Sequence, residues 1–538
     1  MPVTVAVVGA GPVGLMAMKN LKEVGFEVSG FEKRGYVGGL WKQSWEDSSI
    51  SVTERTVFNS SRFRSSISDY PFPDHYDDYP TAKQLHGYLE SYCDHFDLRR
   101  HIRLDAEIKS IKRDRDQDQW VLTFEQQDGI AQTQRFDKVM ICTGSFVSPK
   151  TPKLAGIDKF QGTTMHSVNF PHPSRFKDQN VLLVGLHATA QDLTVELHGY
   201  AKKVYIAHRI GLVLLPRFMP DGRAMDVGQT LGLVFIQLFM EAWFPRAWAW
   251  VMNKILASMS SAAFPNQPEE WRLKPHPSAA TVTPLVGDAI YPHLQSGFAT
   301  PVAAVDGITG PKTVRLTDGR VLEDIDAIIY CTGYDFASPC RPEEYDPFPV
   351  RGQPPNLYRN IFPIHEDAGI RNSLAFLGYS AIVFSGLVQF ELSAMAVSQI
   401  WRGNASPLPS LSEMQRWRAR HLAWRRGIVE RAKPSETHSF VVAFVDPPDY
   451  VSWVNETAGL GMLEHFGTFS RKAWRFWWHD RDFYSLCKNG VFSPAMWRLF
   501  DMGKRKAWVG AREQIIKDNE LVKKRGEERL VALKKERS

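Results

Sequence analysis

The chain has 538 residues, 43% of them hydrophobic, and a formal net charge of +6, which predicts two or three domains with a large core. Residues 504–538 hold twelve basic and six acidic residues, so this segment carries the whole excess charge and the rest shows no nucleic-acid-binding signature. The five scattered cysteines contain no C-x-x-C, which argues against a disulfide framework, a zinc site and a dithiol redox centre.

A βαβ unit opens the chain. Val3 to Val8 is a continuous apolar run typical of a strand buried on both faces, Val13 to Val24 has apolar residues at helical spacing, and Phe26 to Phe31 predicts a second strand. The turn between the first strand and the helix reads Gly9-Ala-Gly-Pro-Val-Gly14. Its glycines permit a tight turn, close approach of a pyrophosphate and close packing of helix on strand. This pattern predicts a bound dinucleotide.

Glu32 ends the second strand, where its carboxylate can accept hydrogen bonds from ribose hydroxyls, while the helix N-terminus offers N–H groups to the phosphates. Gly38-Gly-Leu-Trp41 follows and is expected to wrap the same cofactor, although an ordinary glycine turn with a surface tryptophan would read the same way. Further along, Thr81 caps a predicted helix through about His95, and β segments lead to Asp137-Lys-Val-Met-Ile-Cys-Thr-Gly144.

The second half repeats this plan. A strand at Asn180 to Val184 leads into a turn and a helix through Leu197, and a strand at Val204 to His208 follows. Asp326-Ala-Ile-Ile-Tyr-Cys-Thr-Gly333 then repeats the D-x-x-x-x-C-T-G spelling that ends at Gly144. The pattern predicts an α/β fold of two Rossmann-like dinucleotide-binding domains, the second inserted in the first.

The second glycine turn reads Gly185-Leu-His-Ala-Thr-Ala190, so a histidine stands where the second glycine belongs. His187 would crowd a pyrophosphate lying on the turn; the dinucleotide either sits further out or His187 itself touches a phosphate. The following strand is succeeded by Arg209 rather than an acid, and a guanidinium can pair with a 2′-phosphate. We therefore expect NADPH rather than NADH, the alternative being a vestigial domain that binds nothing.

We expect FAD in residues 1–150 and 326–440, and NADPH in 151–325, with an apolar helical insertion at about 213–296. Residues 441–538 are expected to form a mostly helical extension with a basic tail, either a solvated surface helix or disordered. Two such domains imply hydride transfer from nicotinamide to flavin. A disulfide reductase is disfavoured because a cysteine pair is missing, which leaves a quinone or O2 as acceptor.

Phe160-Gln-Gly-Thr-Thr-Met-His-Ser-Val-Asn-Phe170 resembles the F-x-G-x-x-x-H-x-x-x-[FY] signature of the flavin-containing monooxygenases, which are class B flavoprotein monooxygenases. Other motifs resemble the family in the same order over about residues 1–405: the two stretches around Gly9 and Gly38, then Asn59-Ser-Ser61, Asp69-Tyr-Pro-Phe-Pro73, Cys331-Thr-Gly-Tyr334, and Leu377-Gly-Tyr through Gln389-Phe-Glu391. Pro171 departs from the basic residue usual after Phe170 and gives the signature a Baeyer–Villiger-like feature.

The resemblance implies that NADPH reduces FAD, that O2 forms a C4a-hydroperoxyflavin, and that one oxygen atom passes to the substrate. It implies Asn59 and Gln389 as catalytic residues and His166 at the interdomain hinge. No metal ligand is expected. The residues expected to bind the cofactors are Gly9, Ala10, Gly11, Pro12, Val13, Gly14, Glu32, Gly39, Leu40, Trp41, Asn59, Ser60, Thr143, Gly144, Gly185, His187, Thr189, Ala190, Arg209, Thr332, Gly333 and Gln389.

The aromatic insertion predicts a hydrophobic small-molecule substrate, oxygenated in a tailoring step of secondary metabolism. Within this chemistry the alternatives are N- or S-oxygenation, Baeyer–Villiger oxidation of a ketone, and hydroxylation or epoxidation. Outside it they are a flavoprotein reductase and a protein that only binds flavin. The apolar run Leu231 to Met240 is shorter than the roughly 20 residues that cross a bilayer. It is expected to line a substrate passage, to touch a membrane surface through 231–250, or to form a buried helix. A strand beginning at Val3 leaves no room for a signal peptide, so the expectation is a cytoplasmic protein, with membrane association through the insertion as a variant.

Overall fold

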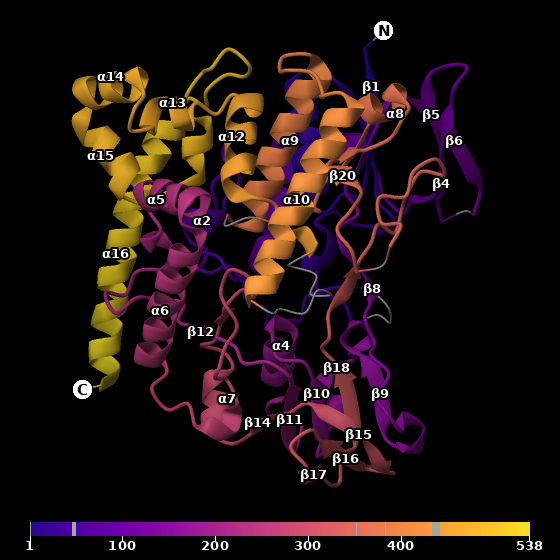
Figure 1. Ribbon diagram of the computed structural model, residues 1–538, viewed down its shortest axis with the longest axis vertical. Helices are drawn as coiled ribbons and strands as arrows, with labels where there is room; N and C mark the ends of the chain where they lie inside the picture. The colour runs from indigo at the N-terminus through magenta and orange to yellow at the C-terminus, as the bar shows by residue number, and fades with distance from the viewer. Residues whose placement is uncertain are drawn as a thin grey trace.

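The computed structural model describes residues 2–45, 50–127, 129–350, 352–381, 384–432 and 442–537. Two parallel five-stranded sheets organise the molecule, one in its upper part and one at its lower end in Figure 1. The helices at residues 231–263 and the last helix of the chain lie along the left side of the molecule in this view.

The first sheet has the strand order β22-β7-β1-β2-β3. Its strands are β1 (Thr4–Val8), β2 (Glu27–Phe31), β3 (Ile102–Arg103), β7 (Lys138–Ile141) and β22 (Leu374–Phe376). All its pairings are parallel. Because β22 comes from beyond the second sheet in sequence, the second domain is an insertion in the first.

The second sheet has the strand order β14-β11-β10-β18-β9. Its strands are β9 (Thr163–His166), β10 (Asn180–Val184), β11 (Lys203–His208), β14 (Ala299–Ala303) and β18 (Ala327–Tyr330). The expected boundary at residues 325 and 326 is wrong, because β18 pairs with β10 and β9 inside this sheet. The first domain therefore resumes after the Cys331-Thr-Gly333 turn rather than before the strand that precedes it.

The chain crosses between the two domains twice, and the two crossings pair with each other. β8 (Phe146–Pro149) and β19 (Tyr334–Phe336) form an antiparallel ribbon. Antiparallel three-stranded sheets flank each domain: β4 (Glu107–Asp114), β5 (Gln119–Glu125) and β6 (Ala131–Phe136) in the first, and β15 (Val305–Gly310), β16 (Thr313–Leu316) and β17 (Val321–Leu322) in the second. The short ladders β12 (Leu214–Leu215) with β13 (Leu285–Val286), and β20 (Leu357–Tyr358) with β21 (Phe362–Pro363), complete the strands.

Local sequence accounts for the helices nearest the first sheet. α1 (Pro12–Glu23) begins with proline at its first position, which suits the fixed φ of that residue. The predicted helix after Thr81 is confirmed as α3 (Ala82–His95), whose capping box joins the Thr81 side chain to Gln84 N–H and the Gln84 side chain to Thr81 N–H. The other helices of the nucleotide domains are α2 (Arg62–Ser65), α4 (Ala188–Leu197), α8 (Ala368–Ser373) and α9 (Gly386–Arg402).

The insertion and the C-terminal part are helical, as predicted. Their helices are α5 (Leu231–Trp243), α6 (Pro245–Ala263), α7 (Tyr291–Gln295), α10 (Leu411–Ala432), α12 (Pro447–Ala458), α13 (Met462–Phe466), α14 (Arg471–His479), α15 (Arg481–Asn489) and α16 (Ala511–Arg537). Val234 of α5, Leu392 of α9, Val454 of α12 and Ile515 of α16 belong to one buried apolar cluster. The C-terminal part therefore shares a core with the first domain and the insertion.

The tail forms the helix that one of the two alternatives predicts, α16, but one side of its first half is packed against the protein rather than solvated. Ile515 and Val522 are buried, and the Arg525 and Arg529 guanidiniums both pair with the Asp78 carboxylate, at 2.7 Å and 2.8 Å. Arg529 also donates to the carbonyl of Gly222 in the insertion. The helix thus contacts the first domain and the insertion together.

A buried group of charges joins the C-terminal part to α1. The Arg498 guanidinium donates to both carboxylate oxygens of Glu23, at 2.6 Å and 2.9 Å, and lies 3.2 Å from Asp69. Lys19 pairs with the same two carboxylates. Burial alone would raise the pKa of Glu23, but Arg498 and Lys19 outweigh it and hold that pKa at about 2.

Replacing Arg498 with alanine should destabilise the protein by about 3 kcal/mol, because the buried Asp69 carboxylate and the partly exposed Glu23 carboxylate lose their guanidinium. In the parent protein, the lowered pKa of Glu23 contributes stability above pH ~4.5, and this contribution is lost as the pH falls toward the native pKa of about 2. Arg498→Ala should therefore also flatten this acid dependence. Urea midpoints at pH 3 to 7 measure both effects.

The matched control is Arg315→Ala, which removes an exposed ion pair with Asp306 at 2.7 Å and should cost less than about 1 kcal/mol. Equal midpoints for the two variants would contradict the assignment of Arg498 as a buried anchor.

Candidate functional site

The first glycine turn is built around backbone contacts that exclude side chains. Gly9 has φ +101°. A Cβ on it would lie 2.7 Å from the carbonyl oxygen of Cys142. A Cβ on Gly14 would lie 1.8 Å from the carbonyl oxygen of Gly9, so helix α1 touches the turn directly. Gly11, the N-cap of α1, supplies no side chain to its first turn. The uncapped N–H groups in the first turn of α1 can therefore donate hydrogen bonds to a phosphate oxygen.

Glu32 ties the end of β2 to this turn. It is only 7% exposed, its Oε2 accepts from Ala10 N–H at 2.8 Å, and its Oε1 accepts from Arg34 N–H at 3.0 Å. A carboxylate has about four lone-pair positions, so capacity is left for ribose hydroxyls. The two backbone bonds fix the carboxylate beside the turn.

The Gly38 to Trp41 stretch closes over the same turn. Gly38 N–H donates to the carbonyl of Ala10 at 2.9 Å. A Cβ on Gly39 would lie 3.1 Å from the Cα of Gly11. The Trp41 ring packs edge-on against Phe58 at 5.2 Å, directly before Asn59. The structure thus gathers the first turn, Glu32 and this stretch into one cradle, and Leu40 lies within it.

The second glycine turn repeats the first in geometry. Gly185 has φ +115° and donates to the carbonyl of Ala207 at 2.8 Å, as Gly9 donates to Phe31 at 2.7 Å. A Cβ on Gly185 would lie 2.5 Å from the carbonyl oxygen of Cys331, the counterpart of Cys142. The two domains therefore share the same strand-to-helix construction, as the repeated spelling predicts.

His187 is the N-cap residue of α4, and its ring is directed to the insertion. Its Nε2 lies 3.1 Å from the carbonyl oxygen of Thr283, so this nitrogen carries the proton and donates. Burial lowers the pKa of His187, which favours the neutral ring. Thr189 and Ala190 form the first turn of α4, and exposed Arg209 directly follows β11.

The segment that carries Asn59 spans the interface between the two domains. Thr56 Oγ1 donates to the Asp192 carboxylate of α4 at 2.8 Å, and Arg55 N–H donates to Glu196 of the same helix at 2.8 Å. Burial raises the pKa of Asp192 to about 6. The Asn59 side chain itself is exposed.

Asp226 of the insertion holds the other end of this segment. Its Oδ2 accepts from Ser61 N–H at 2.7 Å and from Ser60 Oγ at 3.1 Å. Asn59 therefore lies between two anchors, one on α4 and one on the insertion. No local sequence pattern marks Asp226, because its partners lie about 165 residues earlier. Asp192 lies seven residues after Gly185, in the helix that follows the glycine turn. This position in the sequence could have indicated it as a candidate site residue.

The remaining predicted residues lie at strand ends and on α9. Thr143 and Gly144 follow β7, where the Tyr379 hydroxyl lies 3.5 Å from Thr143 Oγ1 and donates to the Gly144 carbonyl at 3.3 Å. Gln389 is 2% exposed in the first turn of α9, which packs against α1. Gln389 is thus buried, in contrast to the exposed Asn59.

Thr332 and Gly333 sit where the chain returns to the first domain. The Thr332 hydroxyl donates to the carbonyl of Lys150, and the Gly333 carbonyl lies 3.0 Å from Nε2 of His166. His166 is buried, and desolvation lowers its pKa. It therefore lies at the junction of the two domains, beside the β8–β19 ribbon.

The fold and these two turns define a protein with paired nucleotide-binding domains. The chain belongs to the flavin-binding monooxygenase-like family, whose family model matches residues 3–537. It is 34% identical over 529 residues to Monooxygenase aurF of Gibberella zeae, covering 96% of this chain and 97% of the relative. The family match extends well beyond the residues 1–405 over which the motifs carry the resemblance.

Solved structures agree in fold. S-allyl-L-cysteine S-oxygenase of Allium sativum has a TM-score of 0.60 at 21% identity, covering 85% of this chain and 89% of its own. Cyclohexanone monooxygenase of Rhodococcus sp. Phi1, solved with NADP+, has a TM-score of 0.58 at 20% identity, covering 86% and 98%. The predicted α/β fold and the assignment as a flavin-containing monooxygenase are confirmed.

Gly14→Ala should abolish flavin retention, because its Cβ would collide with the Gly9 carbonyl 1.8 Å away. The measurement is the flavin-to-protein absorbance ratio after purification. Gly87→Ala is the control: it lies within α3, where a Cβ meets only the Tyr76 hydroxyl at 3.4 Å, and it should retain flavin fully. Flavin retained by both variants would show that the turn does not hold the cofactor.

Proposed function

We propose that the protein is an FAD- and NADPH-dependent monooxygenase that transfers one atom of O2 to a hydrophobic small molecule. The observation that carries this proposal is the pair of equivalent glycine turns, one followed by Glu32 and the other by Arg209. A carboxylate suits ribose hydroxyls, whereas a guanidinium suits the 2′-phosphate that distinguishes NADPH from NADH. Family membership supports flavin, and the fold neighbour solved with NADP+ supports the second nucleotide.

The residues fit the two nucleotides in distinct ways. In the first domain the turn at Gly9 to Gly14 would hold the FAD pyrophosphate, Glu32 the ribose, and Gly39 to Trp41, Ser60, Thr143 and Gly144 the remainder. In the second domain Gly185, Thr189 and Ala190 would hold the NADPH pyrophosphate, and Thr332 and Gly333 would border it. When bound, FAD supplies hydride acceptance from NADPH and activation of O2.

Asn59 and Gln389 are the proposed catalytic residues. Asn59 lies on a segment that is bonded both to α4 and to the insertion, through Thr56, Ser60 and Ser61. Its backbone is therefore anchored at the domain interface, and its exposed carboxamide can donate a hydrogen bond to a reacting oxygen there. Asp226 acts as a positioning residue for it. We place Gln389, buried against α1, beside the flavin ring.

The substrate assignment rests on the insertion and on departures in the signature. The insertion contributes apolar and aromatic side chains, and Pro171 and His187 replace residues usual in the family, so we propose a specialised tailoring step in secondary metabolism. Baeyer–Villiger oxidation of a ketone is the second candidate, favoured by Pro171. A reductase would oxidise NADPH without incorporating oxygen from 18O2 into any product.

Anaerobic mixing with NADPH and with NADH tests the nucleotide assignment. NADPH should bleach the flavin faster than NADH, and Arg209→Ala should reduce that preference at least tenfold by removing the phosphate partner. Arg175→Ala, another exposed arginine of the same domain, should leave it unchanged. If neither nucleotide reduces the flavin, the monooxygenase proposal fails and a flavin-binding role takes its place.

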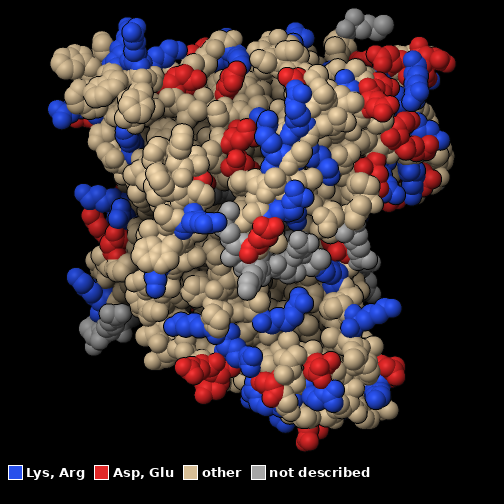
Figure 2. Space-filling view, in the orientation of Figure 1, with Lys and Arg blue, Asp and Glu red and all other residues tan. Residues whose placement is uncertain are grey.

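The insertion is also proposed to contact a membrane surface. Leu233, Ile236, Phe239 and Trp243 recur along α5 at helical spacing and are 48–71% exposed, and Arg246 lies exposed beyond them. The surface over α5 and α6 is largely uncharged in Figure 2. Apolar and aromatic side chains with a neighbouring cation suit an anionic lipid surface. Over the described residues, no helix has the length and apolar character to span a bilayer.

Sedimentation with phosphatidylserine vesicles tests this contact. Phe239→Ser with Trp243→Ser should reduce binding at least tenfold, because both exposed rings are lost. Ile130→Ser with Val321→Ser, which removes exposed apolar residues elsewhere, should not. Equal binding by all three proteins would exclude α5 as the contact.

A further inference from the structure

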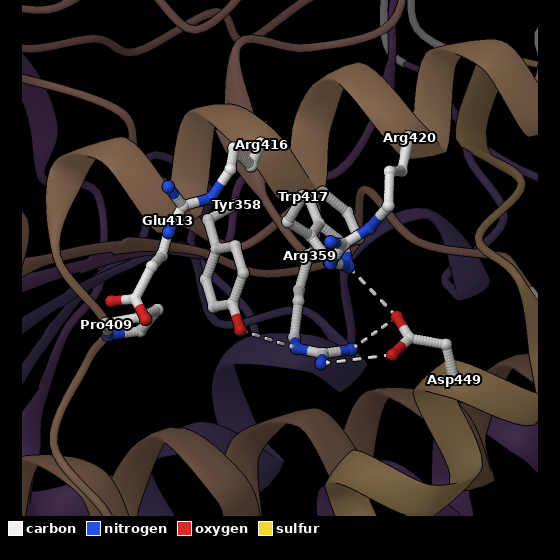
Figure 3. A pocket seen from close by; sticks show the side chains of 8 residues that line it. All are labelled: Tyr358, Arg359, Pro409, Glu413, Arg416, Trp417, Arg420 and Asp449. Carbon is white, nitrogen blue, oxygen red and sulfur yellow. Dashed lines mark hydrogen bonds and ion pairs between the residues drawn. The ribbon is translucent and has the colours of Figure 1, made fainter.

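A hollow of about 250 Å³ lies between α10 and the turn that follows β20. None of the predicted cofactor-binding residues lines it. Figure 3 shows its floor, formed by Tyr358, Arg359 and Asp449, and the side chains of α10 above them. The hollow is thus walled by aromatic rings and charged groups.

The floor is rigid and electrically balanced. The Arg359 guanidinium is bound to the Asp449 carboxylate at 2.8 Å and 3.3 Å, and it donates to the Tyr358 hydroxyl at 3.1 Å. Trp417 Nε1 donates to the same carboxylate at 2.9 Å. The Trp453 ring lies 4.9 Å from the guanidinium. These contacts leave the floor with no net charge.

The rim carries two arginines and one acid. Arg416 and Arg420 are exposed, one helical turn apart on α10, and within the described chain neither forms an ion pair. Glu413 also lines the hollow, three residues before Arg416, and its carboxylate accepts from Ser410 N–H at 2.9 Å and Ser410 Oγ at 2.6 Å. One acid against two arginines leaves the rim with a net positive charge. Figure 3 shows the Arg420 side chain directed toward the Trp417–Asp449 contact. Like charges at this spacing repel, so a bound anion would stabilise them.

A tight hairpin turn lies under the floor. Arg359 and Asn360 have φ +54° and +56°, and Ile361 N–H donates to the Tyr358 carbonyl at 3.0 Å, as in the turns that join paired antiparallel strands. The Asn360 amide holds the turn in place by donating to the carbonyls of Tyr379 at 3.1 Å and Ala443 at 3.2 Å. This turn is what presents Arg359 to the hollow.

We propose that the hollow binds a small phosphomonoester anion, with Arg416 and Arg420 as its ligands. Guanidinium groups bind phosphate oxygens in paired hydrogen bonds, and the Tyr358 ring offers an apolar face to the rest of the molecule. The volume of about 250 Å³ falls below the roughly 300–1,000 Å³ of drug-sized ligand pockets, so a dinucleotide is excluded. The site is therefore separate from both cofactor sites.

Calorimetric titration of the flavin-loaded protein with inorganic phosphate, at ionic strength held constant with NaCl, tests the site. We expect saturable binding that weakens at least tenfold in Arg416→Gln/Arg420→Gln. The matched control is Arg471→Gln/Arg475→Gln, a pair of exposed arginines at the same spacing on α14, which should bind as the parent does. Flavin reduction by NADPH should be unchanged in both variants, which separates this site from the proposed function.

A second arm distinguishes free phosphate from a lipid headgroup. Phosphatidylcholine vesicles with and without phosphatidic acid are sedimented with the same three proteins. Phosphatidic acid-dependent binding lost only in Arg416→Gln/Arg420→Gln would identify a phosphomonoester headgroup as the source. No saturable binding in either arm, or an equal loss in the α14 variant, would overturn the proposal.

Discussion

The carbonyl of Cys142 approaches Gly9 so closely that no side chain fits between them, and the first domain is arranged around this contact. It brings the ends of β1 and β7 together and lets α1 begin at their edge. Glu32 and Gly39 then reach the same turn through hydrogen bonds and backbone packing. The equivalent contact between Gly185 and Cys331 creates the same arrangement in the second domain. Ligands of parallel α/β sheets bind at such strand ends.

Hydrogen bonds, as well as the two chain crossings, join the two domains. Thr56 and Arg55 bond to α4, and Ser60 and Ser61 bond to Asp226, so one short segment of the first domain is held by two parts of the second. Any movement of one domain relative to the other must either break these hydrogen bonds or move the segment of Arg55 to Ser61 along with the second domain. The geometry of Asn59 is therefore a property of the interface rather than of one domain.

Patterns within about 30 residues could be predicted from the sequence, and those across longer distances could not. The βαβ unit and the Thr81 capping box follow from local spacing, and both are present. The boundary near Asp326 was misplaced because a strand's own sequence does not tell which of two similar sheets it joins. The buried stripe of α16 could not be predicted because its apolar positions are few. Asp78, which pairs with Arg525 of this helix, is hundreds of residues away in the sequence. The roles of individual site residues remain predictions.

The ion pairs between α16 and Asp78 can form only late in the synthesis of the chain. Arg525 and Asp78 are 447 residues apart. At translation rates of roughly 5–20 residues per second, Asp78 emerges on the order of 20–90 s before its partner is made. During synthesis the first domain therefore lacks the two guanidiniums that α16 later supplies to Asp78. Completion of this domain is coupled to the end of translation, even though its glycine turn is among the first segments synthesised.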